Sequence, residues 1–311
     1  MKTDPSHFFR LLLAGACLAG CHGGRVEDNG KTTVVTTIFP CHDFARAICG
    51  GAANVLMLVP PGVSVHAYDP SPADLLKARK ADVFVYIGGE SEAWVREKLL
   101  PSLDAPGMKV VRLMDFAGAP GEEDAEEEGE EDHGEHGRDE HLWTSPKNAM
   151  LLLDAMCDGI CEKDPANEAL YRANAKRRRD ELAALDAEFT AIVAAAGRRT
   201  LVVADKFPFA HFVKHYGLGH EAAFPGCCDQ ADAGARTVAR LVAAVRRENI
   251  PYVYHVELGS PNVAAAVCAE TGAGMLLLHS CHNIARREFD AGATYISLMR
   301  QNAANLRRGL E

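Results

Sequence analysis

The most constraining feature of the sequence is a long stretch without helix breakers. Between Pro165 and Ala195 there is no glycine and no further proline. Leu182, Leu185 and Phe189 supply apolar positions among many alanine, arginine and glutamate residues. This pattern predicts one helix of about 30 residues, which spans about 45 Å at 1.5 Å per residue. Such a helix is longer than one small lobe, so we expect it to connect two.

Short apolar or β-branched runs lie on both sides of this helix and alternate with helical segments. They occupy residues 32–37, 55–59, 82–87 and 109–113 before it, and 200–204, 252–256 and 275–278 after it. Strands that alternate with helices predict parallel sheets. We therefore expect an α/β protein with two lobes, each a mainly parallel sheet flanked by helices, joined by one long rigid helix. The expected boundaries are 32–163 for the N-terminal lobe, 164–196 for the linker helix and 197–311 for the C-terminal lobe.

The first residues have the pattern of a secretory signal. Lys2 and Arg10 precede an apolar stretch at residues 11–20, which predicts a signal peptide over residues 1–20. Leu18-Ala19-Gly20-Cys21 resembles the bacterial lipobox, which implies a lipid-modified Cys21. Residues 21–31 then form a polar tether. We expect an extracytoplasmic protein that is anchored to the cell membrane by lipid.

The net charge of −10 comes from one segment. Residues 122–141 hold twelve Asp or Glu and one Arg, so the rest of the chain is close to neutral. This balance argues against nucleic-acid binding. The segment 122–140 is too polar to pack and predicts a mobile loop. Its His133 and His136 could attract metal weakly, as an accessory to a stronger site.

Three histidines stand where ligands bind in open α/β sheets, beyond strand ends or at the edge of a lobe. His66 follows the run 55–59, His141 ends the acidic loop, and His279 follows the run 275–278. Neutral imidazole is a ligand for zinc, manganese and iron. The sequence has no G-x-S-x-G, Walker A, H-E-x-x-H or dinucleotide motif, so we expect a binding protein and no enzyme.

Several stretches together resemble the solute-binding lipoproteins of bacterial zinc and manganese ABC transporters. The matching segments are PPGVSVHAYDPSP at 60–72, KADVFVYI at 80–87, HLWTSP at 141–146, AETG at 269–272 and MRQN at 299–302. This resemblance implies two α/β lobes bridged by a rigid helix that permits only modest lobe movement. It also implies a Zn²⁺ cargo in the cleft between the lobes, an ABC permease as partner, and a monomer.

The resemblance implies His66 and His141 as the N-terminal ligands. The position that holds the third metal ligand in this family corresponds to Lys206 here. The ammonium of Lys206 has no lone pair for a metal. The position of the fourth falls on His279. Asp205 and Cys281 are the candidates for the remaining ligand, and the other residues that could approach the cleft are Cys227, Cys228, His211, His255 and Glu257.

Two other functions fit parts of this pattern. A manganese or iron carrier of the same family would need more oxygen ligands. A secreted zinc hydrolase would need an open metal position and a general base, for which Asp205 or Glu257 is available. The eight cysteines beyond Cys21 allow 105 disulfide pairings. Among them, Cys157 and Cys161 lie four residues apart, and we expect them to be buried thiols.

Overall fold

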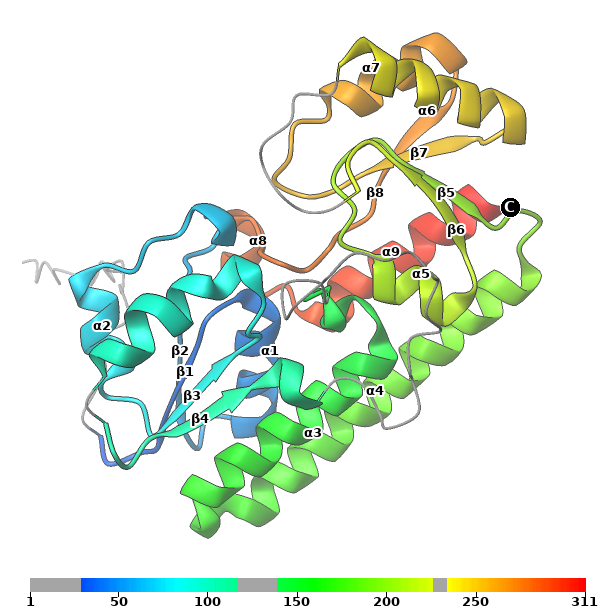
Figure 1. Cartoon of the computed structure of the whole chain (residues 1–311). Helices are drawn as coiled ribbons and strands as arrows, with labels where there is room; N and C mark the ends of the chain where they lie inside the picture. Colours follow the sequence, from blue (N-terminus) through cyan, green and yellow to red (C-terminus); the bar gives the residue numbers. More distant parts are fainter. Residues whose placement is uncertain (1–28, 104, 117–138, 226–233) are drawn as a thin grey trace, which may run out of the picture.

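A computed structural model describes residues 29–103, 105–116, 139–225 and 234–311. It shows two lobes on one long helix (Figure 1). The helix α4 spans Glu168–Ala195, directly after a 3₁₀ turn at Pro165–Asn167. Tyr171, Leu182 and Phe189 are fully buried along one stripe of α4. The predicted linker helix is therefore present. Its buried stripe packs against both lobes.

The N-terminal lobe holds a four-stranded parallel sheet in the order β2-β1-β3-β4. Its strands are β1 (Thr33–Thr36), β2 (Asn54–Met57), β3 (Val83–Tyr86) and β4 (Lys109–Arg112). Its helices are α1 (Phe39–Cys49), α2 (Pro72–Ala78) and α3 (Pro146–Lys163). The central strands β1 and β3 are completely buried, as expected of parallel strands covered on both faces.

The C-terminal lobe repeats this architecture with the order β6-β5-β7-β8, again parallel. Its strands are β5 (Thr200–Val203), β6 (Gly219–Ala222), β7 (Tyr252–His255) and β8 (Gly274–Leu277). Its helices are α5 (Ala210–Tyr216), α6 (Ala235–Glu248) and α7 (Asn262–Thr271), followed by α8 (Arg286–Asp290) and α9 (Tyr295–Leu310). The predicted two-lobe α/β fold is confirmed.

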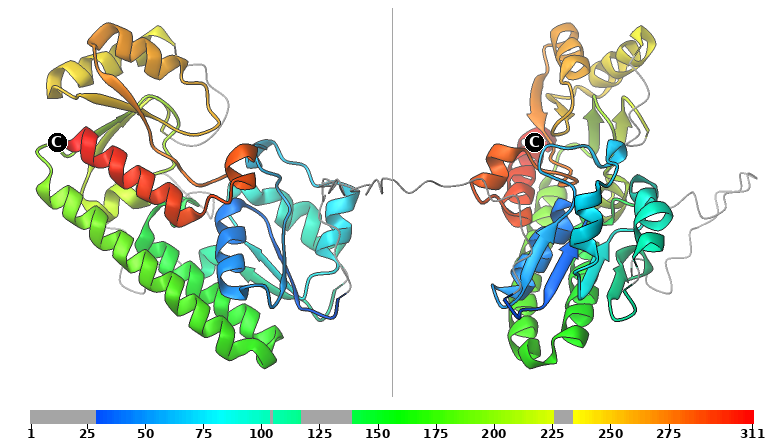
Figure 2. Two further views of the ribbon diagram at one scale, coloured as in Figure 1. Left: turned by 180° about the vertical axis from the view of Figure 1, so that it is seen from behind. Right: turned by 90° about the vertical axis from the view of Figure 1, so that its left-hand side faces the viewer.

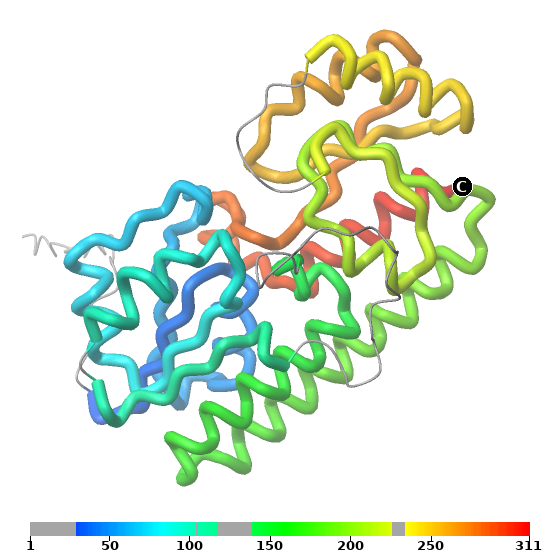
Figure 3. Tube along the Cα trace, in the orientation of Figure 1, coloured from blue at the N-terminus to red at the C-terminus, as the bar shows by residue number. Residues whose placement is uncertain are grey.

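The chain crosses between the lobes a second time after β8. Helix α8 lies beside the N-terminal lobe, and α9 then returns along α4 to the C-terminus (Figures 1 and 2). The backbone N–H of Tyr295 donates to Asp43 of α1 at 3.2 Å. The tube view shows the segment after β8 running to the N-terminal lobe and α9 returning beside α4 (Figure 3). Residues 278–295 therefore join the lobes as a second connection beside α4.

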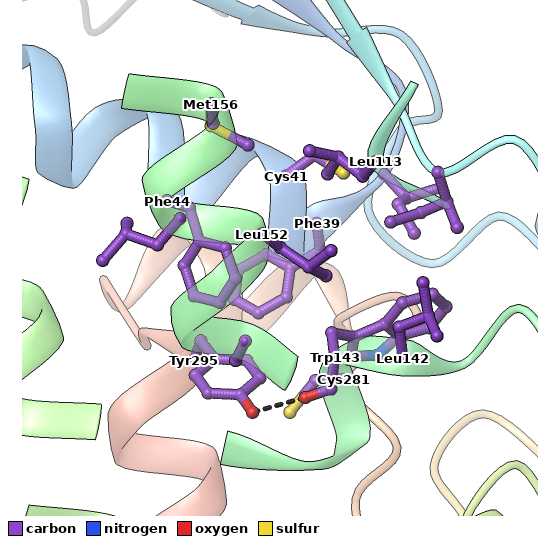
Figure 4. Packing of buried hydrophobic residues seen from close by; sticks show 14 of the residues in the cluster. Phe39, Cys41, Phe44, Leu113, Leu142, Trp143, Leu152, Met156, Cys281 and Tyr295 are labelled. Atoms are coloured by element: carbon purple, nitrogen blue, oxygen red, sulfur yellow. Dashed lines mark hydrogen bonds between the residues drawn. The ribbon is translucent and has the colours of Figure 1, made fainter. Parts of the chain in front are cut away.

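Aromatic side chains fill the core where these crossings meet the N-terminal lobe (Figure 4). The Tyr295 ring meets Phe44 edge to face, with 5.0 Å between the ring centroids. The Tyr295 hydroxyl donates to the carbonyl of Trp143. The indole N–H of Trp143 donates to the carbonyl of Ser280 at 2.8 Å. Both polar tips are thus satisfied inside the core, which fixes the loop after β8 against the loop that carries His141.

Gly50 ends α1 in a conformation that favours glycine. Its φ of +54° lies in the left-handed region. A Cβ there would also lie 2.7 Å from the Nδ2 atom of Asn174 on α4, which donates to the carbonyl of Ile48 at 3.0 Å. The hydrogen bond between Asn174 and the Ile48 carbonyl holds the end of α1 against the linker helix α4.

The cysteines within the described ranges are free thiols, namely Cys41, Cys49, Cys157, Cys161, Cys268 and Cys281. Cys157 and Cys161 are buried, as predicted, with 3.9 Å between their sulfur atoms. Cys21, His133, His136, Cys227 and Cys228 lie outside the described residues. In the part of the chain that the structure describes, no helix is both long enough and apolar enough to cross a membrane.

Candidate metal centre

A cavity of about 180 Å³ lies between the two lobes. The N-terminal lobe contributes His66, in the 3₁₀ turn Val65–Ala67 that follows β2. The C-terminal lobe contributes the segments after β5, β7 and β8, with Lys206, Glu257 and His282 among the lining residues. The carboxyl ends of the strands of both sheets thus face one space, which is where ligands bind in such folds.

His66, Glu140 and His282 form the one metal-type cluster found among the described residues. One ligand atom from each lies within 4.8 Å of the others. The ring centroids of His66 and His282 are 5.4 Å apart. The ring of His141 is 5.1 Å from that of His282. Two imidazoles and one carboxylate therefore converge, and the His141 ring lies beside them.

The orientation of the buried His141 ring is fixed by Asp139. The Nδ1 atom of His141 lies 2.8 Å from Asp139 Oδ1, which also accepts from the His141 backbone N–H at 2.7 Å. Burial acts in the opposite direction, but these hydrogen bonds keep the pKa of Asp139 below its ordinary value. An ionised carboxylate at Nδ1 places the proton there and leaves the lone pair on Nε2, the arrangement typical of a metal-bound histidine.

His282 is an uncharged imidazole in this position. Burial lowers its pKa well below the ordinary value, and the charges of His141, His66 and Lys206 act in the same direction. Its Nε2 atom is buried and accepts or donates no hydrogen bond within the described ranges. A neutral, half-buried imidazole with a buried and unused nitrogen fits a metal ligand, because ligand histidines bind unprotonated.

Glu140 is buried, and its carboxylate lies against the segment of Gly89 and Ser91. Its Oε2 accepts from the backbone N–H of Ser91 at 2.9 Å. A Cβ at Gly89 would lie only 1.9 Å from the same oxygen, so the absence of a side chain at this position lets the carboxylate approach. The second oxygen, Oε1, is not used by that bond.

Comparisons with known proteins identify the family of this chain. A family profile described as "ZnuA: Zinc-uptake complex component A periplasmic" matches residues 34–309. The chain belongs to the ZnuA family. It is 32% identical over 304 residues to the zinc-binding lipoprotein AdcA of Streptococcus pneumoniae, covering 96% of this chain and 60% of that protein. The chain thus spans about three fifths of the length of the AdcA proteins that it matches.

A second relative matches the ZnuA-family chain over nearly its whole length. It is the high-affinity zinc uptake system protein ZnuA of Bacillus subtilis, 30% identical over 303 residues, with 96% of this chain and 94% of that protein covered. Among solved structures, the Zn(II)-bound ZnuA-like domain of Streptococcus pneumoniae AdcA superposes with a TM-score of 0.75 at 28% identity. That match covers 90% of this chain and 99% of the other.

Among the residues predicted as ligands, the structure places His66 in the cluster and His141 beside it, with its ring 5.1 Å from that of His282. His279 lies elsewhere in the same loop and is 1% exposed. Its backbone N–H and carbonyl both bond the Asn302 side chain at 2.7 Å. Its Nδ1 accepts from the backbone N–H of Cys281 at 2.9 Å. These contacts hold His279 in the interior, and it is not a member of the cluster of His66, Glu140 and His282.

The other predicted candidates line the cavity or lie behind it. The Oδ1 and Oδ2 atoms of Asp205 accept from the backbone N–H groups of Lys206 at 2.8 Å and Val256 at 3.1 Å. Burial raises the pKa of Asp205. Cys281 is fully buried, and burial raises the pKa of its thiol well above the ordinary value.

Three further candidates have local partners. Both oxygens of Glu257 accept from Ser280, one from its backbone N–H at 2.7 Å and one from its hydroxyl. The Nε2 atom of His211 lies 2.9 Å from the carbonyl of Asp139. His255 ends β7, with its Nδ1 atom 3.1 Å from the Val256 carbonyl.

The sequence analysis missed His282 and Glu140. His282 stands three residues after His279 in the same loop, so both follow the same strand. Glu140 is the residue before His141. The available signal was adjacency to a predicted ligand, which by itself does not tell which of two neighbours faces the cleft.

Proposed function

We propose that this ZnuA-family protein captures Zn²⁺ between its lobes and delivers it to an ABC permease. The observation that carries the proposal is the convergence of His66, Glu140 and His282, with ligand atoms within 4.8 Å, beside the ring of His141. Three nitrogen donors and one oxygen donor suit the tetrahedral preference of zinc. Relatives named as zinc-binding and zinc-uptake proteins support the same cargo.

The alternative functions receive less support from the site. Manganese prefers a larger share of oxygen ligands than one carboxylate among three imidazoles. A zinc hydrolase would need a general base beside a metal-bound water. Asp205 and Glu257 already accept backbone or hydroxyl hydrogen bonds at all four of their oxygens. These hydrogen bonds hold the two carboxylates in the cavity wall.

The remaining parts of the chain extend this function. We propose that Cys21 carries the lipid that keeps the protein at the membrane, near a permease. The acidic segment 122–140, with His133 and His136, would raise the local concentration of metal near the cleft by weak attraction.

The test compares His282→Ala with His279→Ala in a zinc competition against a chromophoric chelator. Zinc sites of this kind are worth about 10–16 kcal/mol, so loss of one of four ligands costs about 3 kcal/mol, or about a hundredfold in affinity. We expect this loss in His282→Ala, His66→Ala and His141→Ala. His279→Ala should keep the parental affinity in the folded fraction.

A matched control is His220→Ala, because His220 stacks on Phe207 with 3.9 Å between centroids and does not line the cavity. It should bind zinc as the parent does. Parental affinity in His282→Ala together with a loss in His279→Ala would assign the C-terminal ligand to His279 and reject our ligand set.

A further inference from the structure

Helix α5 of the C-terminal lobe contacts a segment of the N-terminal lobe that carries part of the metal centre. This segment, residues 139–145, directly precedes α3 and includes Glu140 and His141. On α5, His211 and His215 stand four residues apart, and side chains at this spacing are neighbours on one face of a helix. One face of α5 therefore presents two imidazoles toward the ligand-bearing segment.

Each of these histidines bonds one end of the segment. The Nε2 atom of His211 lies 2.9 Å from the carbonyl oxygen of Asp139. A carbonyl oxygen can only accept, so this nitrogen carries a proton and donates it. The Nδ1 atom of His215 forms a hydrogen bond with the hydroxyl of Ser145. The two bonds thus hold the first and the last residue of the segment, and both cross from one lobe to the other.

The hydroxyl of Ser145 has a local alternative that it does not use. Ser145 is the N-cap residue of α3, where a serine side chain usually accepts from a backbone N–H two or three residues later. Within the described range 139–225, no such bond is present at this helix end. The Ser145 side chain is instead buried and bonded to His215. A contact between the lobes therefore takes the place of a cap that would stabilise the helix locally.

Asp139 connects His211 to the metal centre. Its backbone carbonyl accepts from His211, and its Oδ1 atom accepts from the backbone N–H of His141 at 2.7 Å. The same oxygen lies 2.8 Å from His141 Nδ1. A displacement of Asp139 would turn the His141 ring, whose Nε2 must face the ion. His211 therefore acts on the orientation of His141 without touching the ion.

We propose that His211 and His215 are positioning residues of the metal site, which hold residues 139–145 from the C-terminal lobe so that Glu140 and His141 stay directed toward the cleft. This inference rests on the proposed function and adds two residues to its site. Loss of a hydrogen-bond partner behind a metal ligand costs about 10–100-fold in affinity. Because His211 acts through the intervening Asp139, we expect the lower end of this range.

Zinc competition against a chromophoric chelator tests His211 in the full-length protein. His211→Phe keeps an aromatic ring of similar size and removes the N–H donor, so the zinc affinity should fall about tenfold. His211→Gln places an amide N–H near the position of Nε2 and should return the affinity to within about twofold of the parent. The matched control is His220→Phe, because His220 does not line the cavity, and it should bind as the parent does. Parental affinity in His211→Phe overturns the proposal.

The His141→Ala background separates positioning of the ligand from a general effect on the fold. If His211 acts through His141, the further loss caused by His211→Phe should be much smaller in this background than in the parent. A full tenfold loss there would refute the proposed route. A parent that binds no zinc would instead refute the proposed function, so the two failures are distinct.

A double-mutant cycle tests the second bond. His215→Phe and Ser145→Ala remove the same hydrogen bond from opposite sides, so their losses in zinc affinity should be alike. The double variant should lose no more than either single variant. Parental affinity in both single variants, or losses that add in the double variant, would exclude a role for this bond at the metal site.

Discussion

Glu92 is a buried acid beside the metal centre, and its replacement by glutamine makes a sharp test of the local electrostatics. The residue is 1% exposed. Its Oε2 accepts from the backbone N–H groups of Ile87 at 2.7 Å and Gly88 at 2.9 Å. Burial raises the pKa of Glu92 from 4.5 to about 7, and the nearby Glu140 carboxylate acts in the same direction.

The sign of the effect follows from this raised pKa. Between pH 4.5 and 7 the folded protein keeps a proton on Glu92 that the unfolded chain has released. The contribution of Glu92 to the free energy of unfolding therefore falls as the pH rises through this window. The difference between the two pKa values corresponds to about 3 kcal/mol, at about 1.4 kcal/mol per pKa unit. Glu92→Gln removes this cost, because the amide oxygen can still accept both backbone N–H groups.

Urea denaturation of the metal-free protein at pH 4.5 and pH 8 measures the effect. Relative to the parent, Glu92→Gln should gain about 3 kcal/mol more at pH 8 than at pH 4.5. The control is Glu90→Gln, since the Glu90 side chain is 58% exposed on the same turn, and its effect should not depend on pH. A difference between parent and Glu92→Gln that is the same at both pH values would refute the reasoning.

Three further outcomes follow from the sequence and the structure. Burial, aided by the charge of Arg46, lowers the pKa of His42 from 6.5 to about 4; the contribution of His42 to the unfolding free energy should therefore fall by about 3 kcal/mol as the pH falls through this range, and His42→Gln should gain about that much relative to the parent between pH 7 and pH 4 in the same denaturation assay, whereas an equal difference at both pH values would contradict this. Deletion of residues 122–138 should leave the thermal midpoint and the high-affinity zinc site unchanged, and should remove weak zinc equivalents from a calorimetric titration; loss of the strong site would place His133 or His136 in it. Cys21→Ser should release the protein from the membrane fraction on cell fractionation, and unchanged association would exclude an acyl anchor at this cysteine.

The sequence was sufficient to predict the two lobes because its strands are apolar runs and its linker helix has no breaker. Strand β6 was missed for a physical reason. Its sequence, Gly219–Ala222, contains no β-branched or aromatic residue, and it is an edge strand with exposed positions. It forms because β5 offers it a complete register, from Thr200 against Gly219 onward. Pairing with a neighbour here overrides weak local propensity.

Local sequence patterns also could not predict the return of the chain to the N-terminal lobe. The hydrogen bond from Tyr295 to Asp43 joins residues 252 positions apart, and no periodicity encodes such a pair. Sequence analysis therefore assigned residues 278–295 to the C-terminal lobe, whereas their contacts tie both lobes together. Tertiary packing alone decides this crossing.

In the candidate site too, sequence motifs predict some positions, whereas the conformation of a loop decides others. His66 and His141 were predictable from their motifs, whereas the choice between His279 and His282 depends on the backbone between them. Cys281 has a φ of +59°, a left-handed conformation that reverses the course of the chain. His279 consequently lies in the interior and His282 at the cavity. The left-handed turn at Cys281 thus gives His279 and His282 their different positions.

The double connection between the lobes bears on how the ion would be held and released. Helix α4 and residues 278–295 both join the lobes, and Asn283 bonds the carbonyls of Pro60 and Val63 in the loop that carries His66. Large opening of the cleft would break these contacts. The ligands are therefore held in place before the ion arrives, and a preorganised site binds with little ordering cost. Release must then come from movement within the loops of His66 and His282, and a permease that pulls on either loop would lower the affinity without separating the lobes.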